Sequence, residues 1–250
     1  MSNTEKVMWL LKRLGEAPYE LGVTELADEI GYEKSGVFKT LKLLVQGGFV
    51  VQNQSTKKYS VGPALYRLGT VYGERKVILQ VAEPVLKAMS YMTEETVSIG
   101  IREGDDAILA YKIEGPISIR LENRIGRMYP LNAGAIGKLL GAYHNEERIR
   151  EILSQTELTK NTQNTIVDQE ELLLEYEIIR SRGYAISDEE NREGSFGISA
   201  PIYDQNGDVW SCLCLAGPKE RFTKKKVDNW IGLVINGANE ISLKLGYNPN

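Results

Sequence analysis

The sequence predicts an α+β protein of two domains joined by a helix. Residues 1–62 contain three helical patterns followed by two short β-rich runs, and residues 63–78 continue as a linker helix. Residues 79–250 alternate strands, turns and helices. With 250 residues, of which 42% are hydrophobic, the chain is long and apolar enough to bury a core in each of two domains of ordinary size.

The first domain combines helices with a β-hairpin. Apolar residues recur at helical spacing in each helix, and Thr24 is the expected N-cap of the short second helix, which Gly31 ends. Two β-rich runs flank a polar tip at 53–57 and indicate a hairpin. The expected ranges are 5–14, 24–31 and 34–46 for the helices and 49–52 and 58–61 for the strands. This order is the layout of a winged helix-turn-helix.

A local positive charge sets this region apart from an acidic chain. The net charge of the protein is −4, yet residues 34–73 contain six basic side chains and no acidic one. Lys39 and Lys42 should lie opposite the apolar stripe of the third helix, where they could enter a major groove. The predicted partner is double-stranded DNA, and the alternative is a solvated face. The predicted contacts are Lys34, Ser35, Gly36, Lys39, Thr40, Lys42, Lys57 and Lys58.

The linker helix predicts self-association. Its apolar stripe consists of Leu65, Leu68, Val71 and Tyr72, which a monomer could not easily cover. Specific DNA recognition commonly uses two half-sites related by symmetry, so we expect at least a homodimer.

The second domain is expected to pack helices on a sheet. Asn206-Gly207 is a strong hairpin signal between two of its strands, and Asp168 with Glu171 forms a variant of the capping box. The expected strands are 97–101, 107–113, 117–123, 184–187, 196–203 and 208–216, and the expected helices are 79–95, 135–143, 145–153, 168–182 and 223–245.

Several classes of function find little support. No apolar run reaches the roughly 18 residues of a membrane span, and no secretory signal opens the chain, so we expect a cytoplasmic protein without a membrane partner. One histidine and two cysteines argue against a metal site, a cofactor or histidine-based catalysis. The segment 132–139 lacks the glycine and hydroxyl residues of a P-loop. The acidic loop 187–191 is a solvated turn or the rim of a ligand pocket, without the spacing of an EF-hand.

The chain resembles the IclR family of bacterial transcriptional regulators over nearly its whole length. The resemblance rests on the segments 23–31, 34–44, 59–62, 129–138, 182–190, 198–202 and 215–218. It implies a winged helix-turn-helix, a linker helix and a C-terminal GAF-like α/β effector-binding domain. It also implies dimers that often pair into homotetramers, a small organic acid as effector, and repression or activation of operons for small carbon sources. For this chain we expect a repressor of a catabolic operon. A DNA-binding regulator without an effector, or an enzyme with a basic patch, remains the alternative.

The resemblance also assigns a ligand pocket to the second domain. Its expected residues are Ala135, Ile136, Gly137, Ser187, Gly197, Trp210, Cys212, Cys214 and Ala216. Strand alternation should put the last four on one face. Members that bind very small oxoacids carry more polar side chains at the positions of Ser187, Gly197, Cys214 and Ala216. The space opened at Gly197 and Ala216 should therefore suit a bulkier acid with an apolar body. We expect its carboxylate to bind backbone N–H groups near the start of the helix at 135–137.

Overall fold

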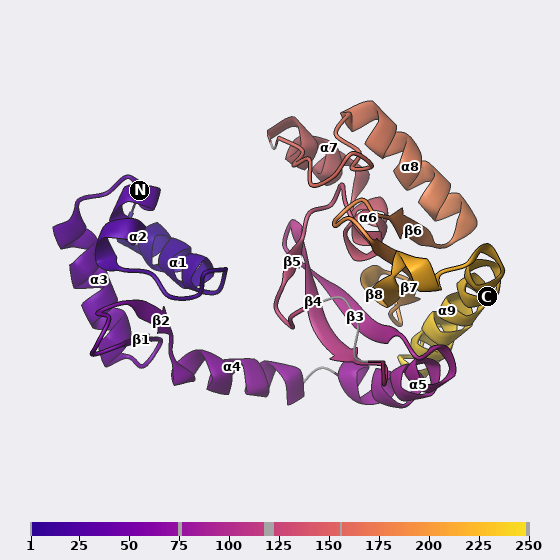
Figure 1. The fold of residues 1–250 in the computed structure, drawn as a ribbon, viewed down its shortest axis with the longest axis horizontal. Coiled ribbons are helices and arrows are strands. Elements are labelled where there is room, and N and C mark those ends of the chain that lie inside the picture. The colour runs from indigo at the N-terminus through magenta and orange to yellow at the C-terminus, as the bar shows by residue number, and fades with distance from the viewer. Residues whose placement is uncertain (1, 75–76, 118–122, 156, 249–250) are drawn as a thin grey trace. The chain divides into compact units, whose positions relative to one another are not determined.

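The chain forms two compact units. The computed structural model describes residues 2–74, 77–117, 123–155 and 157–248. The units are Met1–Lys76 and Val77–Asn250, and Figure 1 shows the elements of each. The linker helix is counted with the first unit, and the division of the chain at residues 62 and 78 stays a prediction.

The first unit is a winged helix-turn-helix. Its elements are α1 (Asn3–Leu14), α2 (Val23–Ile30), α3 (Lys34–Gln46), β1 (Val50–Gln52), β2 (Tyr59–Val61) and α4 (Pro63–Glu74). The three first helices bury Leu10, Leu26 and Leu41 in one cluster. Strands β1 and β2 pair antiparallel, and Leu21 forms a bridge to Tyr59, which ties the start of α2 to the wing.

The start of α2 differs from the prediction. Gly22, not Thr24, is the N-cap, and the helix begins at Val23. The carboxylate of Glu25 accepts a hydrogen bond of 2.6 Å from the N–H of Gly22, which satisfies a donor that the helix itself leaves unpaired. A glutamate at the third helical position therefore fixed the helix start, and Thr24 lies inside the first turn.

The second unit is a sheet covered by helices on both faces. Its elements are α5 (Val77–Thr93), β3 (Thr96–Glu103), β4 (Asp106–Ile113), β5 (Met128–Tyr129), α6 (Ala135–Ala142), α7 (Glu146–Gln155), α8 (Gln169–Arg182), β6 (Ala185–Asp188), β7 (Ser195–Tyr203), β8 (Val209–Pro218) and α9 (Lys224–Lys244). The strand order is β5-β4-β3-β8-β7-β6, with every neighbouring pair antiparallel. This curled sheet with flanking helices matches the α/β, GAF-like domain that the sequence predicts.

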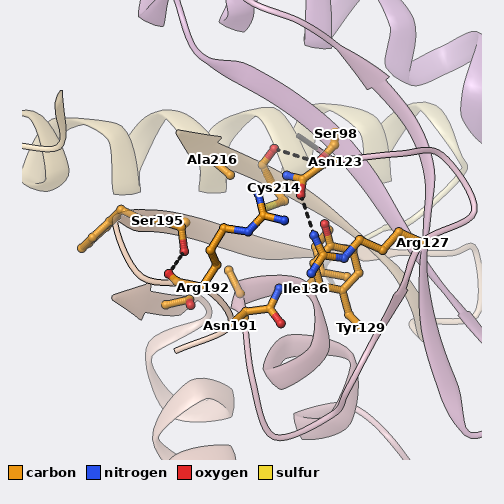
Figure 2. A pocket seen from close by; sticks show the side chains of 15 residues that line it. Ser98, Asn123, Arg127, Tyr129, Ile136, Asn191, Arg192, Ser195, Cys214 and Ala216 are labelled. Atoms are coloured by element: carbon orange, nitrogen blue, oxygen red, sulfur yellow. Dashed lines mark hydrogen bonds between the residues drawn. The ribbon is translucent and has the colours of Figure 1, made fainter. Parts of the chain in front are cut away.

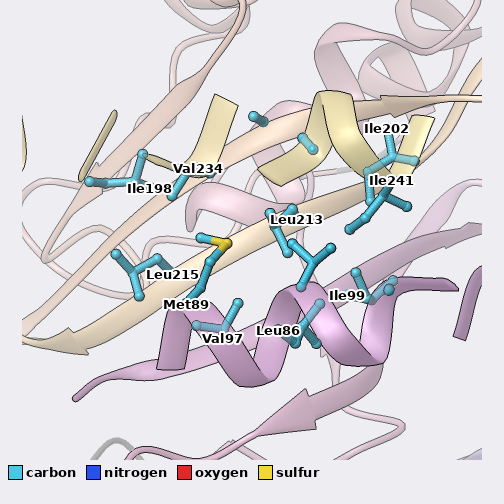
Figure 3. Packing of buried hydrophobic residues seen from close by; sticks show 14 of the residues in the cluster. Leu86, Met89, Val97, Ile99, Ile198, Ile202, Leu213, Leu215, Val234 and Ile241 are labelled. Atoms are coloured by element: carbon cyan, nitrogen blue, oxygen red, sulfur yellow. The ribbon is translucent and has the colours of Figure 1, made fainter. Parts of the chain in front are cut away.

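Two hydrophobic clusters hold the helices to the sheet. Figure 3 shows the cluster between the sheet and helices α5 and α9, where Leu86 and Met89 meet Leu213 and Ile241. The other face of the sheet packs against α6, α7 and α8 around the fully buried Tyr176. The small side chains of β8, including Cys214, belong to this second face.

The strand predicted at 117–123 falls largely outside the residues that the structure describes. The interior of 117–123 lies outside the described residues, and the described ends, Ile117 and Asn123, are not in a strand. Met128 and Tyr129 form the short edge strand β5 against β4, which was not predicted. Two residues are too few to show the alternation from which strands are predicted.

Within the described ranges, no helix combines the length and the apolar character needed to span a bilayer.

A β-bulge breaks the alternation of β8. Val209 pairs with Tyr203 and Ser211 pairs with Ile202, so Trp210 is the extra residue of a bulge. Because the extra residue turns the strand, Trp210 packs against the cluster under α5 and α9, whereas Cys212 and Cys214 face α6. The prediction that Trp210 shares a face with the two cysteines is therefore wrong.

Candidate nucleic-acid interface and ligand pocket

The exposed face of α3 carries most of the predicted DNA contacts. Val37, Leu41 and Leu44 are buried in the core of the first unit. Ser35, Lys39 and Lys42 are exposed on the opposite side, and Lys34 is exposed at the helix start. An exposed helix face that is polar and positively charged suits a major groove. The structure thus brings these four predicted residues together on one surface.

Two further predicted contacts on α3 do not lie on this surface. Thr40 is only 8% exposed, and its hydroxyl donates a hydrogen bond of 3.1 Å to the carbonyl oxygen of Gly36. At about 100° per residue Thr40 falls beside Val37 in the buried stripe, so its prediction as a DNA contact is not supported by its position. Gly36 is half-buried beside the side chain of Lys6 from α1.

The wing is ordered by Asn53. Its side-chain oxygen accepts hydrogen bonds from the N–H groups of Ser55 and Thr56, and its backbone pairs with Lys57 and Lys58. Lys57 is exposed, with a φ of 59°, at the end of this turn. Lys58 is half-buried, and its ammonium lies 3.8 Å from a carboxylate oxygen of Glu25. Lys57 is therefore the freer of the two predicted contacts on the wing.

A cavity of about 50 Å³ opens in the second unit beside the start of α6 (Figure 2). Strands β7 and β8, the loop after β6 and the segment before β5 form its other walls. Six of the nine predicted effector-binding residues line it, namely Ala135, Ile136, Ser187, Gly197, Cys214 and Ala216. The region predicted from the resemblance therefore does contain a pocket.

The other three predicted residues lie outside the pocket wall. Trp210 is turned to the opposite face by the bulge. A Cβ on Gly137 would collide with the carbonyl oxygen of Pro130, so this glycine lets α6 approach the chain before it. Cys212 is fully buried under Gly100, where an added Cβ would lie 2.8 Å from its sulfur. Burial raises the pKa of the Cys212 thiol well above its usual value, so this group stays protonated.

Gly197 does not open the space expected of it. A Cβ at this position would lie 3.3 Å from the Cβ of Ala135 and 3.7 Å from that of Ala216. The missing side chain allows α6 to begin close to β7, and the volume is already filled. Ala216 is half-buried and borders the cavity, so it is the better position for testing the size of a ligand.

Two arginines that the sequence reading missed face the cavity. In Figure 2 the side chains of Arg127 and Arg192 point toward each other across it. Arg127 donates a hydrogen bond of 3.2 Å to the side-chain oxygen of Asn123, and its guanidinium lies 5.2 Å from the centre of the Tyr129 ring. Among the residues that the structure describes, no carboxylate pairs with either guanidinium. The pocket therefore offers positive charge to an anion.

The polar lining stays neutral apart from these arginines. Burial raises the pKa of Tyr129 to about 12 and that of Cys214 to about 12. Both groups therefore keep their protons at neutral pH. Ser98, Asn123 and Asn191 add uncharged polar atoms to the wall. None of these lining groups therefore carries a negative charge that would repel an anionic ligand.

The loop that carries Arg192 is held at several points. The carboxylate of Glu189 accepts hydrogen bonds from the N–H of Gly194 at 2.7 Å and from Lys219 at 2.6 Å. The hydroxyl of Ser195 donates to the carbonyl oxygen of Arg192 at 2.5 Å. Of the alternatives for this acidic loop, the rim of a pocket fits, because Asn191 and Arg192 form part of the wall.

In the described part of the chain, no group of three or more candidate metal ligands converges.

Both units match known families of bacterial regulators. Residues 4–54 match the IclR helix-turn-helix domain, and residues 71–243 match the C-terminal domain of the bacterial transcriptional regulator IclR. The HTH-type transcriptional regulator KdgR of Dickeya chrysanthemi is 33% identical over 247 residues, which cover 99% of this chain and 81% of the relative. The HTH-type transcriptional repressor AllR of Escherichia coli K12 is 30% identical, over 97% of this chain and 89% of the relative.

Solved structures agree with these similarities. The IclR crystal structure from Thermotoga maritima superposes with a TM-score of 0.71 at 32% identity, covering 98% of both chains. The transcriptional regulator from Alicyclobacillus acidocaldarius superposes with a TM-score of 0.84 at 25% identity, again over 98% of both chains.

Proposed function

Because the chain belongs to the IclR family of bacterial transcriptional regulators, we propose that it is a repressor that releases or binds its operator in response to a small organic acid. Like its named relatives, the chain is a DNA-binding regulator, and it is not an enzyme. The acid, the repression of a catabolic operon and the assembly into homodimers or homotetramers are the proposed parts.

The exposed face of α3 supports the DNA contact. Lys34, Ser35, Lys39 and Lys42 share that face, and Lys57 projects from the wing. We propose that α3 enters a major groove while Lys57 and Lys58 reach neighbouring phosphates. Two copies in a homodimer would present two such helices to the two halves of a double-stranded operator.

The proposal of an acidic effector rests on the two arginines that face one cavity. Guanidinium groups bind carboxylates in a bidentate manner, and neither Arg127 nor Arg192 has a carboxylate partner among the described residues. We place the ligand's carboxylate between them, in preference to the backbone at the start of α6. Its carbon skeleton would then lie against Ile136, Cys214 and Ala216.

The cavity limits the size of this acid. The volume of the cavity is about 50 Å³. One water molecule needs roughly 10–15 Å³ of such space. A compact acid with a short apolar body fits this space, and a long chain requires side chains to move. We therefore propose a smaller acid than the bulkier ligand that the sequence predicts.

A thermal-shift screen tests the proposal. Sodium pyruvate, glyoxylate, benzoate and hexanoate are added to the full chain, with sodium chloride at equal ionic strength as the reference. A ligand that binds only the folded state raises the melting temperature, so at least one acid should do so. The shift should vanish in Arg127→Gln and Arg192→Gln, which remove the charge, and in Ala216→Leu, which fills the cavity.

A control variant separates this site from a general charge effect. Arg150 is an exposed arginine on α7 that pairs with Glu146 and is not among the residues that line the pocket. Arg150→Gln should keep the full shift. An equal shift in Arg192→Gln and the wild type would remove the arginine pocket as the site, and no shift with any acid would contradict the small-acid effector.

A further inference from the structure

Phe38 is an exposed aromatic residue on the polar face of α3. Its side chain is 49% exposed and is absent from the residues that pack against the core of the first unit. At about 100° per residue it projects beside Ser35, one turn earlier, and Lys42, one turn later. The fold thus does not use this large apolar side chain, which stands among serine and lysine side chains.

The position of Phe38 along α3 is that of a base-reading residue. It is the fifth residue of a helix that runs from Lys34 to Gln46. In helix-turn-helix proteins the second helix of the motif, here α3, contacts the edges of bases with its N-terminal residues. A phenyl ring has no donor for a phosphate, and the one apolar group that bases expose in the major groove is the C5-methyl of thymine.

We propose that Phe38 recognises thymine methyl groups and is a determinant of the operator sequence. The inference rests on the proposed entry of α3 into the major groove. It assigns different tasks to neighbouring residues of one face: Lys39 and Lys42 supply affinity through charge, and Phe38 supplies discrimination through contact with a methyl group.

The test removes single methyl groups from DNA. Binding sites are first selected from a random duplex library with the full wild-type chain. Each thymine of a selected site is then replaced in turn by uracil, which lacks only the C5-methyl group. The wild type should lose affinity about fourfold at one or two adjacent positions in each half-site, the equivalent of burying one methyl group.

Two variants assign the effect to the residue. Phe38→Ala should bind the thymine and uracil versions of those positions equally, with an unchanged melting temperature because the side chain lies outside the core. Leu43→Ala removes another exposed apolar side chain, 68% exposed, from the second half of the same helix. It should retain the discrimination of the wild type.

The outcomes distinguish this inference from the proposed function. If the wild type binds selected sites but every uracil version equally well, DNA binding stands and the role of Phe38 is overturned. The same follows if Phe38→Ala keeps the sensitivity to the methyl group. If the wild type selects no sequence at all, the proposed DNA-binding function fails, and the inference fails with it.

Discussion

The ammonium of Lys138 lies 2.7 Å from Oε1 of Glu190 and links helix α6 to the loop that carries Arg192. The Lys138 side chain is only 3% exposed, and it also lies 3.0 Å from Oε1 of Glu175 on α8. Burial raises the pKa of Glu190, and the positive charge of Lys138 opposes this rise. The pair therefore joins two walls of the pocket through a contact that solvent hardly reaches.

Removing Lys138 should destabilise the protein strongly. Lys138→Met leaves the carboxylate of Glu190 buried without its cation, and such losses cost about 3–5 kcal/mol. The free energy of unfolding, measured by urea denaturation, should fall by this order. The double variant Lys138→Met with Glu190→Gln removes both charges and should recover part of the loss.

An exposed ion pair provides the control for this prediction. Lys244 pairs with Glu240 on the surface of α9, and both side chains are about half exposed. Lys244→Met should change the free energy of unfolding by less than about 1 kcal/mol. An equally small effect of Lys138→Met would show that the buried pair does not contribute as argued.

Lys39 should contribute to DNA affinity through phosphate. It is exposed on the face of α3 opposite the buried Val37 and Leu41. Lys39→Ala should weaken binding to a selected operator without lowering the melting temperature. In a plot of log affinity against log salt, the slope should become shallower by roughly one unit. Lys87→Ala, on α5 of the second unit, is the matched control, and anisotropy with labelled DNA provides the measurement.

Helix α4 should be part of the dimer interface. Tyr66, Leu68 and Val71 are all exposed on it, Tyr66 by 82%, although large apolar side chains of a helix usually find a partner. The side chain of Tyr72, the fourth member of the predicted stripe, lies outside the described residues. Leu68→Glu should shift the protein toward the monomer in light scattering at micromolar concentration, because a charge would be buried in the contact. A wild type that is already monomeric would contradict the homodimer.

The elements that could be predicted are those with strong local signals. Val37, Leu41 and Leu44 define the buried side of α3 by spacing alone, and Asp168 does cap α8, accepting a hydrogen bond from the N–H of Glu171. These signals act over three or four residues of continuous chain. The expected boundaries of α3 coincide with the observed Lys34 and Gln46.

The features that were missed depend on contacts between distant segments. The bulge at Trp210 arises from the pairing of β8 with β7, which a period of two does not contain. Arg127 and Arg192 are 65 positions apart and come from irregular segments, so only the fold brings them to one cavity. Gly197 looked like open space because Ala135, which fills that space, belongs to another element.

The single histidine should give the stability a distinct dependence on pH. His144 is the only histidine of the chain, and its side chain is 9% exposed. Burial lowers the pKa of His144 below its ordinary value of about 6.5, Arg102 acts in the same direction, and Asp105 opposes them. The unfolded chain therefore binds the proton more readily than the folded chain does. Stability associated with neutral His144 is present above about pH 6.5 and is lost as the pH falls through that value.

The variant His144→Gln isolates this contribution. The free energy of unfolding is measured by urea denaturation at several values between about pH 7.5 and about pH 5.5. It should decrease more steeply in the wild type than in the variant as the pH falls. The raised pKa of Glu190 acts in the opposite direction, because a folded state that holds its proton more tightly gains stability as the pH falls. That contribution is common to both proteins and cancels in their difference, so parallel pH profiles would show that His144 is not held neutral by the fold.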